Sequence, residues 1–328
     1  MTNNESLMTM KRSACLIFNP IAGKSDPDQD LLTIQTLLEP EIDLDIRLTT
    51  PDVDANQLAY EAIERGVHMI IASGGDGTLS AAAEALVGTN IPLGVISRGT
   101  ANAFASALGI PDTIEAACQT ILYGKTKVVD AAQCNGKPMV LLVGVGFEAE
   151  VVEKADRESK NRFGMLAYIL AGVQQLREFE TFEAKIETDE KVVTVTAAAV
   201  TIANAAPATS ILAQGPAGIV YDDGLLDLTV VAPQNRAGAI ASAYHLLQSA
   251  VRGDAAERDD IGYMRARRIR VTTDPPQKVV VDGEIMGTMS IEVECIPGGL
   301  TILVPMTEEV EAFEKLEGLP ELMVEQKP

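Results

Sequence analysis

The sequence predicts two folding units, an N-terminal α/β domain built on a parallel sheet and a C-terminal β-sandwich domain. Up to about residue 123, short apolar runs alternate with helical patterns, which is typical of a parallel sheet with right-handed crossovers. After Lys125 most apolar runs are short enough for strands, with few helical patterns between them. A chain of 328 residues is long enough for both units.

Hydrophobic periodicity and turn residues define the elements of the first unit. Strands are expected at Ala14–Phe18, Asp43–Thr49, Met69–Ala72 and Ile91–Ile96. Helices are expected at Pro27–Leu38, Asn56–Arg65, Leu79–Leu86, Ala101–Leu108 and Asp112–Tyr123. Ligands of such sheets bind beyond the carboxyl ends of the strands, so the loops that follow the strands are expected along one edge. These loops begin at Asn19, Thr49, Gly74 and Gly99.

The second unit starts with a hairpin signal at Asn135-Gly136, which joins expected strands at Lys127–Gln133 and Met139–Phe147. Helical stretches are expected at about Ala149–Phe179 and at Arg236–Arg252. Further strands are expected at Glu183–Thr188, Val192–Asn204, Leu225–Ala232, Ile269–Thr273, Lys278–Val281, Ser290–Ile296 and Leu300–Val304. The predicted domains are therefore 12–133 and 134–305, while 306–328 forms a C-terminal helix and tail that return to the first domain.

A glycine-rich loop, Gly74-Gly75-Asp76-Gly77-Thr78, directly follows the apolar run Met69–Ala72. Glycines let the backbone turn its N–H groups toward an anion, and the N-terminus of the next helix adds a favourable field. Thr78 is expected to cap that helix, and Asp76 to work with a cation such as magnesium on a nucleotide phosphate. The alternative is an ordinary tight turn, which explains the glycines but not the carboxylate.

Charge and composition exclude several classes of partner. The formal net charge of −21 argues against nucleic acid and against docking on anionic lipid by charge alone. The four cysteines are scattered without a C-x-x-C pair, so neither a zinc site nor a disulfide framework is expected. No signal peptide is visible, and proline and glycine interrupt the uncharged stretch Val192–Tyr221, so no transmembrane segment is expected. These observations predict a cytoplasmic protein.

Several motifs follow one another in a defined order. They are Asn19-Pro20 with Gly23-Lys24, then Gly74–Thr78, Gly99–Ala105, Asp222–Asp227 and Asp282–Glu284. The ordered set resembles the diacylglycerol kinase catalytic-domain family, in particular its soluble bacterial lipid kinases, over residues 12–305. The Gly-Gly-Asp-Gly-Thr loop also occurs in NAD kinases and 6-phosphofructokinases, so the specificity lies in the ordered set.

The resemblance implies ATP-dependent phosphorylation of a lipid hydroxyl at the membrane surface, with Mg²⁺ as cofactor and the active site between the domains. The implied nucleotide-binding residues are Asn19, Thr49, Gly74, Gly75, Asp76, Gly77, Thr78, Leu79, Ser80, Thr100 and Asn102. The implied structural Mg²⁺ site consists of the Val220 and Leu225 carbonyls and the Asp223 carboxylate. Glu284 is the implied general base, and Asp76 the second catalytic residue.

The residues around Glu284 allow two interpretations. A carboxylate in a partly desolvated cleft, after the buried-looking strand Val279–Val281, can accept the proton of an alcohol. Alternatively, Asp282-Gly283 is an ordinary hairpin turn and Glu284 a solvated side chain. The turn alone favours the second interpretation, whereas the ordered set of motifs favours the general base.

One residue departs from the family pattern. Ala103 stands where the family usually has an aspartate that supports the network around the catalytic magnesium, which puts rate and metal affinity in question. Two other classes therefore stay open, a small-molecule kinase of the NAD kinase type and a nucleotide-binding regulatory protein with weak catalysis. Diacylglycerol is the first choice of acceptor, but phosphatidylglycerol, a sphingoid base, ceramide or another long-chain alcohol also stay open, as does a homodimer.

A dense basic cluster lies in the second unit, at Arg265, Arg267, Arg268 and Arg270. It could meet lipid head groups. The preferred interpretation is the solvent-facing side of a strand whose Ile269 and Val271 point inward.

Overall fold

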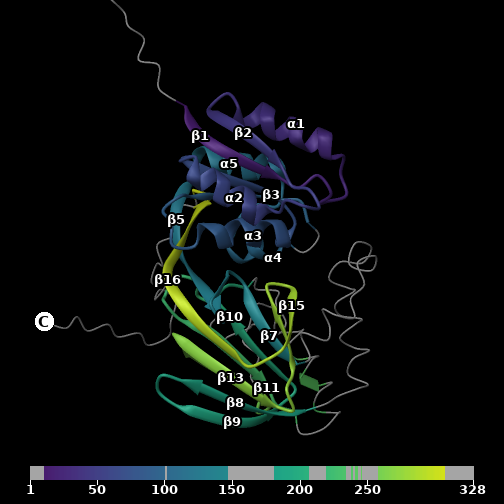
Figure 1. Ribbon diagram of the computed structural model, residues 1–328, viewed down its shortest axis with the longest axis vertical. Helices are drawn as coiled ribbons and strands as arrows, with labels where there is room; N and C mark the ends of the chain where they lie inside the picture. Colours follow the sequence, from purple (N-terminus) through teal and green to yellow (C-terminus); the bar gives the residue numbers. More distant parts are fainter. Residues whose placement is uncertain are drawn as a thin grey trace, which may run out of the picture.

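The computed structural model describes residues 11–99, 102–146, 181–206, 219–233 and 258–306, together with 238, 241, 242 and 245. Two lobes lie end to end, one containing helices and a parallel sheet and the other composed of strands (Figure 1). The predicted fold class, a parallel-sheet α/β unit followed by a β-sandwich unit, is confirmed. The helices predicted near 149–179, at 236–252 and after residue 306 lie outside the described residues, apart from four single positions.

Four parallel strands form the first lobe's sheet in the order β2-β1-β3-β4. Their bounds are Arg12–Phe18 for β1, Ile42–Leu48 for β2, Met69–Gly74 for β3 and Leu93–Ser97 for β4. The helices between and after them are α1 (Pro27–Leu38), α2 (Ala55–Glu64), α3 (Asp76–Leu86), α4 (Ala103–Ala107) and α5 (Ile114–Tyr123). Each expected element is therefore present, with ends shifted by a few residues.

Alternation along each strand places helices on both faces of this sheet. In β1, Cys15 and Ile17 pack in the core with α2, α3 and α4, whereas Leu16 and Phe18 pack in the core with α1 and α5. Both faces of the strand are buried, which explains why its sequence is a continuous apolar run. Side-chain caps start three of the helices, from Asp26 for α1, Asp54 for α2 and Thr113 for α5.

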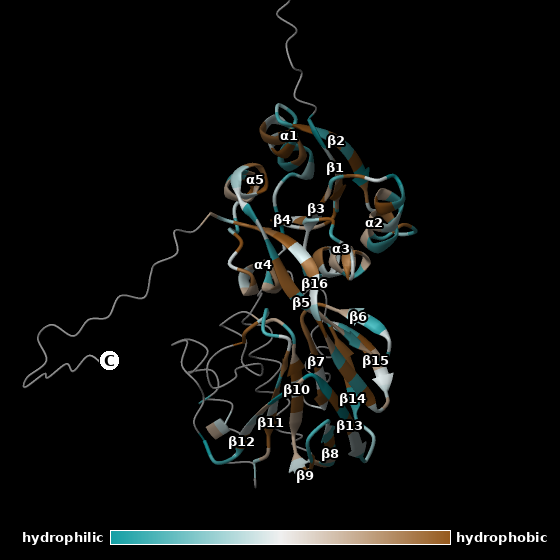
Figure 2. Ribbon diagram, turned by 90° about the vertical axis from the view of Figure 1, so that its left-hand side faces the viewer, coloured by the Kyte–Doolittle hydropathy of each residue, from teal (hydrophilic) through white to brown (hydrophobic). Residues whose placement is uncertain are grey.

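The second lobe has two sheets, and many residues of their strands are hydrophobic (Figure 2). The core between them consists mostly of aliphatic side chains and includes Phe182. One sheet is antiparallel, in the order β12-β11-β10-β7-β14-β15. Its strands are β7 (Leu142–Gly146), β10 (Ala199–Ala203), β11 (Leu226–Val231), β12 (Ile261–Ala266), β14 (Lys278–Val281) and β15 (Glu284–Thr288). The other continues the first lobe's sheet through β16 (Ile291–Val304), β13 (Arg268–Asp274), β8 (Phe182–Thr188) and β9 (Val192–Ala197). The hairpin β5 (Lys125–Cys134) and β6 (Lys137–Met139) joins this sheet through β16.

Strand β16 connects the two lobes (Figure 1). Its first residues pair with β13 in the second lobe, and Ile302 pairs with Leu93 of β4 in the first. A register shift between Ile296 and Leu300 interrupts its pairing with β5. Two separate strands, Ser290–Ile296 and Leu300–Val304, were expected here, but residues 297–299 form an irregularity inside one strand.

Another expected strand, Val192–Asn204, is divided between the two sheets. Residues up to Ala197 form β9, and β10 begins at Ala199 in the other sheet. The amide of Ala198 donates to the Val231 carbonyl, which marks the change of sheet. Alanine and β-branched residues run through the junction without a break, so hydrophobicity alone gave no sign of it.

Candidate active site

The loops that follow β1, β2, β3 and β4 lie along one edge of the parallel sheet, as predicted. Backbone hydrogen bonds join each loop to the neighbouring strand. The Asn19 amide donates to the Ser73 carbonyl at 2.9 Å, Thr49 to Phe18 at 3.0 Å, and Arg98 to Gly74 at 2.7 Å. The side chain of Arg98 adds a longer-range contact, because its Nη1 donates to the carbonyl of Asn19, 79 positions away.

Two glycine loops touch at this edge. A Cβ atom added to Gly99 would lie 2.8 Å from the Cα of Gly75 and 2.9 Å from Oδ1 of Asn102. Contacts that short do not occur, so the approach of the two loops requires glycine at position 99. The close approach forms a strip of exposed or half-buried backbone beside the N-terminus of α3. Such a strip can bind a phosphate through its N–H groups.

Asp76 is the first residue of α3, and its carboxylate contacts the neighbouring loop. Its Oδ1 accepts from the Phe104 amide at 3.1 Å, so it binds the first turn of α4. Burial raises the pKa of Asp76, whereas hydrogen bonds from the amides of Phe104, Ala103 and Asn102 lower it. Asp76 therefore has a structural contact in addition to the metal-related role that the sequence predicts.

Thr78 does not cap α3, contrary to the prediction from the sequence. The N-cap is Gly75, without a side-chain hydrogen bond. The Thr78 hydroxyl instead accepts from Nδ2 of Asn19 at 2.9 Å. The helix begins three residues earlier than a Thr78 cap requires, because Asp76, Gly77 and Thr78 already lie in the helix.

Unsatisfied buried polar atoms concentrate beside these loops. Within the described part of the chain, they include Oγ of Ser73, Ser80 and Ser97, Nη2 of Arg98 and Oδ1 of Asn102. Buried polar atoms in native proteins nearly always have a partner, so this group calls for bound water or a polar ligand. Asn102 also has a left-handed backbone, with φ of 50°. Strained, polar and unsatisfied positions of this kind cluster at ligand sites.

The turn between β14 and β15 presents a second group of acidic residues. Asp282 accepts from the amides of Val140, Leu141 and Leu142 at 2.8, 3.0 and 2.9 Å. Burial raises the pKa of Asp282 to about 6, opposed by these three hydrogen bonds. Asp282 thus anchors the turn, and Glu284, the first residue of β15, is exposed. The expected desolvation of Glu284 is not observed.

Glu84 of α3 faces that turn, and no motif in the sequence marks it as a site residue. Its side chain is half-buried, and burial raises its pKa to about 7, with Asp282 and Glu284 adding to the rise and Lys137 opposing it. Eight residues of helix separate it from Asp76, which corresponds to about 12 Å along α3. One helix therefore carries carboxylates toward both the glycine loops and the second lobe. The helical periodicity of the sequence places Glu84 in a helix but does not indicate that it faces the second lobe.

The turn before β11 holds the implied magnesium ligands. Oδ2 of Asp223 forms an ion pair with Arg265 at 2.7 Å, and its Oδ1 accepts from the Leu225 amide at 3.1 Å. A carboxylate with two carbonyls is an all-oxygen donor set, which suits Mg²⁺. Arg265 already binds one oxygen of Asp223, so a cation would share the carboxylate with it. No group of three or more His, Cys, Asp or Glu side chains suited to a metal occurs among the residues that the structure describes.

Asp130 of β5 supports this turn, and sequence reasoning missed it as well. Its carboxylate is 4% exposed and accepts from the Gly224 amide at 2.7 Å and the Gly298 amide at 2.8 Å. Nδ2 of Asn204 donates to the Asp130 carbonyl at 3.1 Å. Asp130 thereby joins the turn, the irregular part of β16 and the end of β10. A single aspartate inside an apolar strand pattern gives no sequence signal for such contacts.

Two of the four arginines in the basic cluster, Arg268 and Arg270, lie on the solvent side of β13, in line with the preferred interpretation, whereas Arg265 belongs to β12. Arg268 pairs with Glu294 at 3.0 Å and Arg270 with Glu292 at 2.6 Å, across to β16. Ile269 and Val271 between them are buried in the sandwich core. These two arginines are therefore neutralised by neighbouring acids, which removes them as a basic patch.

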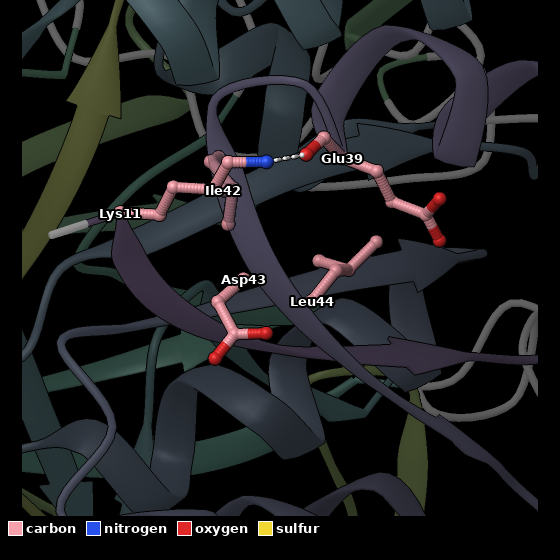
Figure 3. Close-up of a pocket in the computed structure, with 5 residues that line it drawn as sticks. All are labelled: Lys11, Glu39, Ile42, Asp43 and Leu44. Atoms are coloured by element: carbon pink, nitrogen blue, oxygen red, sulfur yellow. Dashed lines mark hydrogen bonds between the residues drawn. The ribbon is translucent and has the colours of Figure 1, made fainter. Parts of the chain in front are cut away.

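A shallow hollow lies at the opposite edge of the first sheet (Figure 3). It is lined by Lys11, Glu39, Ile42, Asp43 and Leu44, and Nζ of Lys11 donates to the Glu39 carbonyl at 2.8 Å. This is where β1 and β2 begin, whereas the glycine loops are where the strands end. The hollow is therefore separate from the candidate site. Thr100, the remaining predicted nucleotide contact, lies outside the described residues.

Comparison with known proteins agrees with this geometry. Residues 13–134 match the model of the diacylglycerol kinase catalytic domain, and residues 141–304 match that of the YegS C-terminal NAD kinase β-sandwich-like domain. A diacylglycerol kinase of Bacillus subtilis is 32% identical over 286 residues, which is 85% of this chain and 92% of that protein. The chain belongs to the diacylglycerol kinase family.

Two further relatives extend this result. An uncharacterized protein of Synechocystis sp. is 50% identical over 311 residues, which is 92% of this chain and 72% of that protein. A crystal structure of a proposed diacylglycerol kinase from Bacillus anthracis str. Sterne superposes with a TM-score of 0.74 at 29% identity, covering 90% of this chain and 98% of the other. Among the described residues of this family member, we find no helix with the length and apolar character needed to cross a membrane.

Proposed function

We propose that this protein is an ATP-dependent lipid kinase that transfers the γ-phosphate to the hydroxyl of diacylglycerol, giving phosphatidic acid and ADP. The observation that carries the proposal is the edge where two glycine loops touch, beside a helix N-terminus and a group of unsatisfied buried polar atoms. Family membership supports phosphoryl transfer to a lipid, and the curated relative from Bacillus subtilis carries the name diacylglycerol kinase.

In this proposal, the backbone N–H groups at Gly75 to Gly77 bind the phosphates of ATP. Glu284 takes the proton of the acceptor hydroxyl while the hydroxyl oxygen attacks the γ-phosphorus, and the bond to the β-phosphate oxygen breaks. Exposure of Glu284 fits an acceptor that approaches from outside the described lobes. Mg²⁺ would neutralise the charge of the transferring phosphoryl group, and Val220, Asp223 and Leu225 would hold a further, structural ion.

The two lobes would divide these functions. Residues 12–133 would bind the nucleotide and residues 134–305 the lipid, with 306–328 returning to the first domain. The enzyme would work in the cytoplasm and bind the membrane surface transiently while it takes up lipid. The net charge of −21 does not favour strong electrostatic attachment to anionic lipid, which fits transient contact.

A transfer assay with radiolabelled ATP tests the proposal. The acceptors are diacylglycerol, phosphatidylglycerol, sphingosine and ceramide in mixed micelles, with NAD as a soluble acceptor. We expect label in phosphatidic acid. Label in another lipid would support a lipid kinase with a different acceptor. Label in NADP would support an NAD kinase instead of a lipid kinase. ATP binding without transfer to any acceptor would indicate a regulatory protein.

A further inference from the structure

Arg98 is a buried charged residue in the middle of the candidate nucleotide site. It follows β4 directly and is 6% exposed. Its guanidinium lies 4.2 Å from the centre of the Phe18 ring. Arginine is rarely buried to this extent unless its charge and its N–H groups are satisfied.

The guanidinium contacts two different segments. Nε forms an ion pair with Oδ2 of Asp30 in α1 at 2.8 Å, and Nη1 donates to the carbonyl of Asn19 at 2.8 Å. The main chain of Arg98 adds a third link, because its amide donates to Gly74 at 2.7 Å. A Cβ atom added to Gly23 would lie 2.8 Å from the carbonyl oxygen of Arg98. The loop after β1 therefore also packs closely against the main chain of Arg98.

Asn19 extends this arrangement to the phosphate loop. While its carbonyl accepts from Arg98, its Nδ2 donates to Oγ1 of Thr78 at 2.9 Å, and its Oδ1 accepts from the Ile21 amide at 3.1 Å. Thr78 lies in the first turn of α3, directly after the glycines. A continuous series of contacts therefore runs from Asp30 through Arg98 and Asn19 to the start of α3.

Stability alone is a poor explanation for this arrangement. A buried ion pair is frequently no more stabilising than apolar side chains of the same volume, because both charges lose their hydration. A guanidinium does something that apolar groups cannot, since its planar fork fixes the directions of several acceptors at once. The remaining nitrogen, Nη2, has no hydrogen-bond partner among the described residues, so the guanidinium does not use all of its donors.

We propose that Arg98 is a positioning residue for nucleotide binding, which holds Asn19 and, through it, Thr78 and the phosphate loop in place. The inference rests on the proposed binding of ATP at the glycine loops. Nothing in the family comparison assigns a role to this position. Arg98 acts through Asn19 and needs no contact with the nucleotide.

Three variants test the proposal. Arg98→Met removes the fork and leaves the buried Asp30 carboxylate without a counter-charge, with the Ser25 hydroxyl as its remaining side-chain donor, so its folding is at risk. Arg98→Lys keeps a positive charge beside Asp30 but cannot reach both Asp30 and the Asn19 carbonyl with fixed geometry. Ile121→Ala is a matched destabilising control, because Ile121 is buried in the same lobe against Gly94, near the start of β4.

Three measurements are made on each full-length variant, and the first is the melting temperature. Calorimetry with ATP and Mg²⁺ gives the dissociation constant, and hydrogen exchange reports the protection of the amides from 74 to 80. We expect Arg98→Lys to melt close to wild type, yet to bind ATP about ten- to a hundred-fold more weakly, with faster exchange at 74–80. Ile121→Ala should melt earlier but keep wild-type affinity and wild-type exchange at those amides.

The outcomes separate the inference from the proposed function. Wild-type affinity and exchange in Arg98→Lys would overturn the positioning role while leaving the kinase proposal intact. Affinity that follows melting temperature across all variants, including Ile121→Ala, would show a purely structural role. A wild-type protein that binds no ATP would overturn the proposed function, and unchanged exchange in Arg98→Lys would then overturn the ordering of the loop as well.

Discussion

At the scale of single residues, Asp76 combines two functions that a suitable pair of substitutions can separate. Its carboxylate accepts from the Phe104 amide, and the sequence predicts that it works with a cation on the nucleotide phosphates. Asp76→Asn keeps an acceptor oxygen but removes a partly desolvated charge, so we expect a melting temperature no lower than that of wild type, with phosphoryl transfer abolished. Asp76→Ala loses the hydrogen bond as well and should cost about 1 kcal/mol of stability. Thermal melts and the lipid transfer assay check both, and an active Asp76→Asn would remove the metal-related role.

Glu284 is tested by a substitution that keeps its size. Glu284→Gln removes the base, so kcat should fall about a hundred-fold or more while ATP affinity is retained. The side chain is exposed and forms no part of either core, so stability should not change. Steady-state kinetics with diacylglycerol and ATP make the measurement. Weaker ATP binding with kcat preserved would make Glu284 a binding residue.

Ala103 allows a gain-of-function prediction. It is the first residue of α4, and its amide faces the carboxylate of Asp76. Ala103→Asp adds a negative charge where the helix dipole favours one but where Asp76 is already partly desolvated. We therefore expect lower stability without magnesium and a faster, more magnesium-dependent reaction with it. Magnesium titrations of melting temperature and of activity test this, and equal or lower activity at every concentration would indicate a site rebuilt around alanine.

At the scale of elements, α3 carries Glu84, whose carboxylate faces the β14–β15 turn and ionises less readily than a free glutamate. Burial and the charges of Asp282 and Glu284 raise the pKa of Glu84 to about 7, from an ordinary value of 4.5. The folded state therefore binds the proton more tightly than the unfolded chain does. This contribution to stability is complete below pH 4.5 and is lost as the pH rises to 7.

Replacing Glu84 should remove this pH dependence. We expect Glu84→Gln to resemble wild type near pH 5 and to be more stable by about 2 kcal/mol at pH 8. Urea unfolding at a series of pH values measures the difference. Glu64→Gln, at an exposed position in α2, is the control and should show no comparable gain. A constant difference between Glu84→Gln and wild type from pH 5 to 8 would contradict the prediction.

The sequence predicted helices and strands well where the hydrophobic periodicity and the helix-capping residues indicated the same boundaries. The strands and helices of the first lobe follow regular patterns, and Asp26, Asp54 and Thr113 mark their helix starts. The prediction failed where one apolar run contributes strands to two sheets, as on either side of Ala198. Residues on both sides of this junction are hydrophobic, so the amino-acid composition does not change where the chain passes from one sheet to the other. Strands β12 and β15 were missed because they lie at sheet edges, where exposed side chains weaken the hydrophobic pattern.

The candidate site was predictable only in part, for a similar reason. Glycine loops carry a local signal, and the order of the strands places them on one edge. Arg98, Glu84 and Asp130 act through partners more than 60 positions away, such as Asp30, Asp282 and Gly224 respectively. Nothing in their immediate sequence marks those partners. Contacts of that kind become visible only when the fold is known.

At the scale of the whole molecule, Asp130 connects the lobes and the implied magnesium turn. Its two oxygens accept from different amides, Oδ2 from Gly224 and Oδ1 from Gly298. An asparagine has one acceptor oxygen, so its NH₂ group would oppose one of these amides. We expect Asp130→Asn to lower stability by about 2 kcal/mol, because one buried donor is left without a partner.

The same substitution should weaken a magnesium effect without touching a magnesium ligand. If Val220, Asp223 and Leu225 hold an ion, magnesium should raise the melting temperature of wild type, because it binds the folded state alone. Asp223→Ala should abolish that rise by removing the only side-chain ligand. Asp130→Asn should reduce it, because its side chain can no longer accept from the Gly224 and Gly298 amides together and so holds the turn less firmly. Arg268→Gln, on the exposed side of β13, is the control and should keep the full rise. Differential scanning calorimetry at several magnesium concentrations decides the matter. A wild-type melting temperature that does not respond to magnesium would remove the ion from this turn, and a full response in Asp130→Asn would show that the turn forms without Asp130.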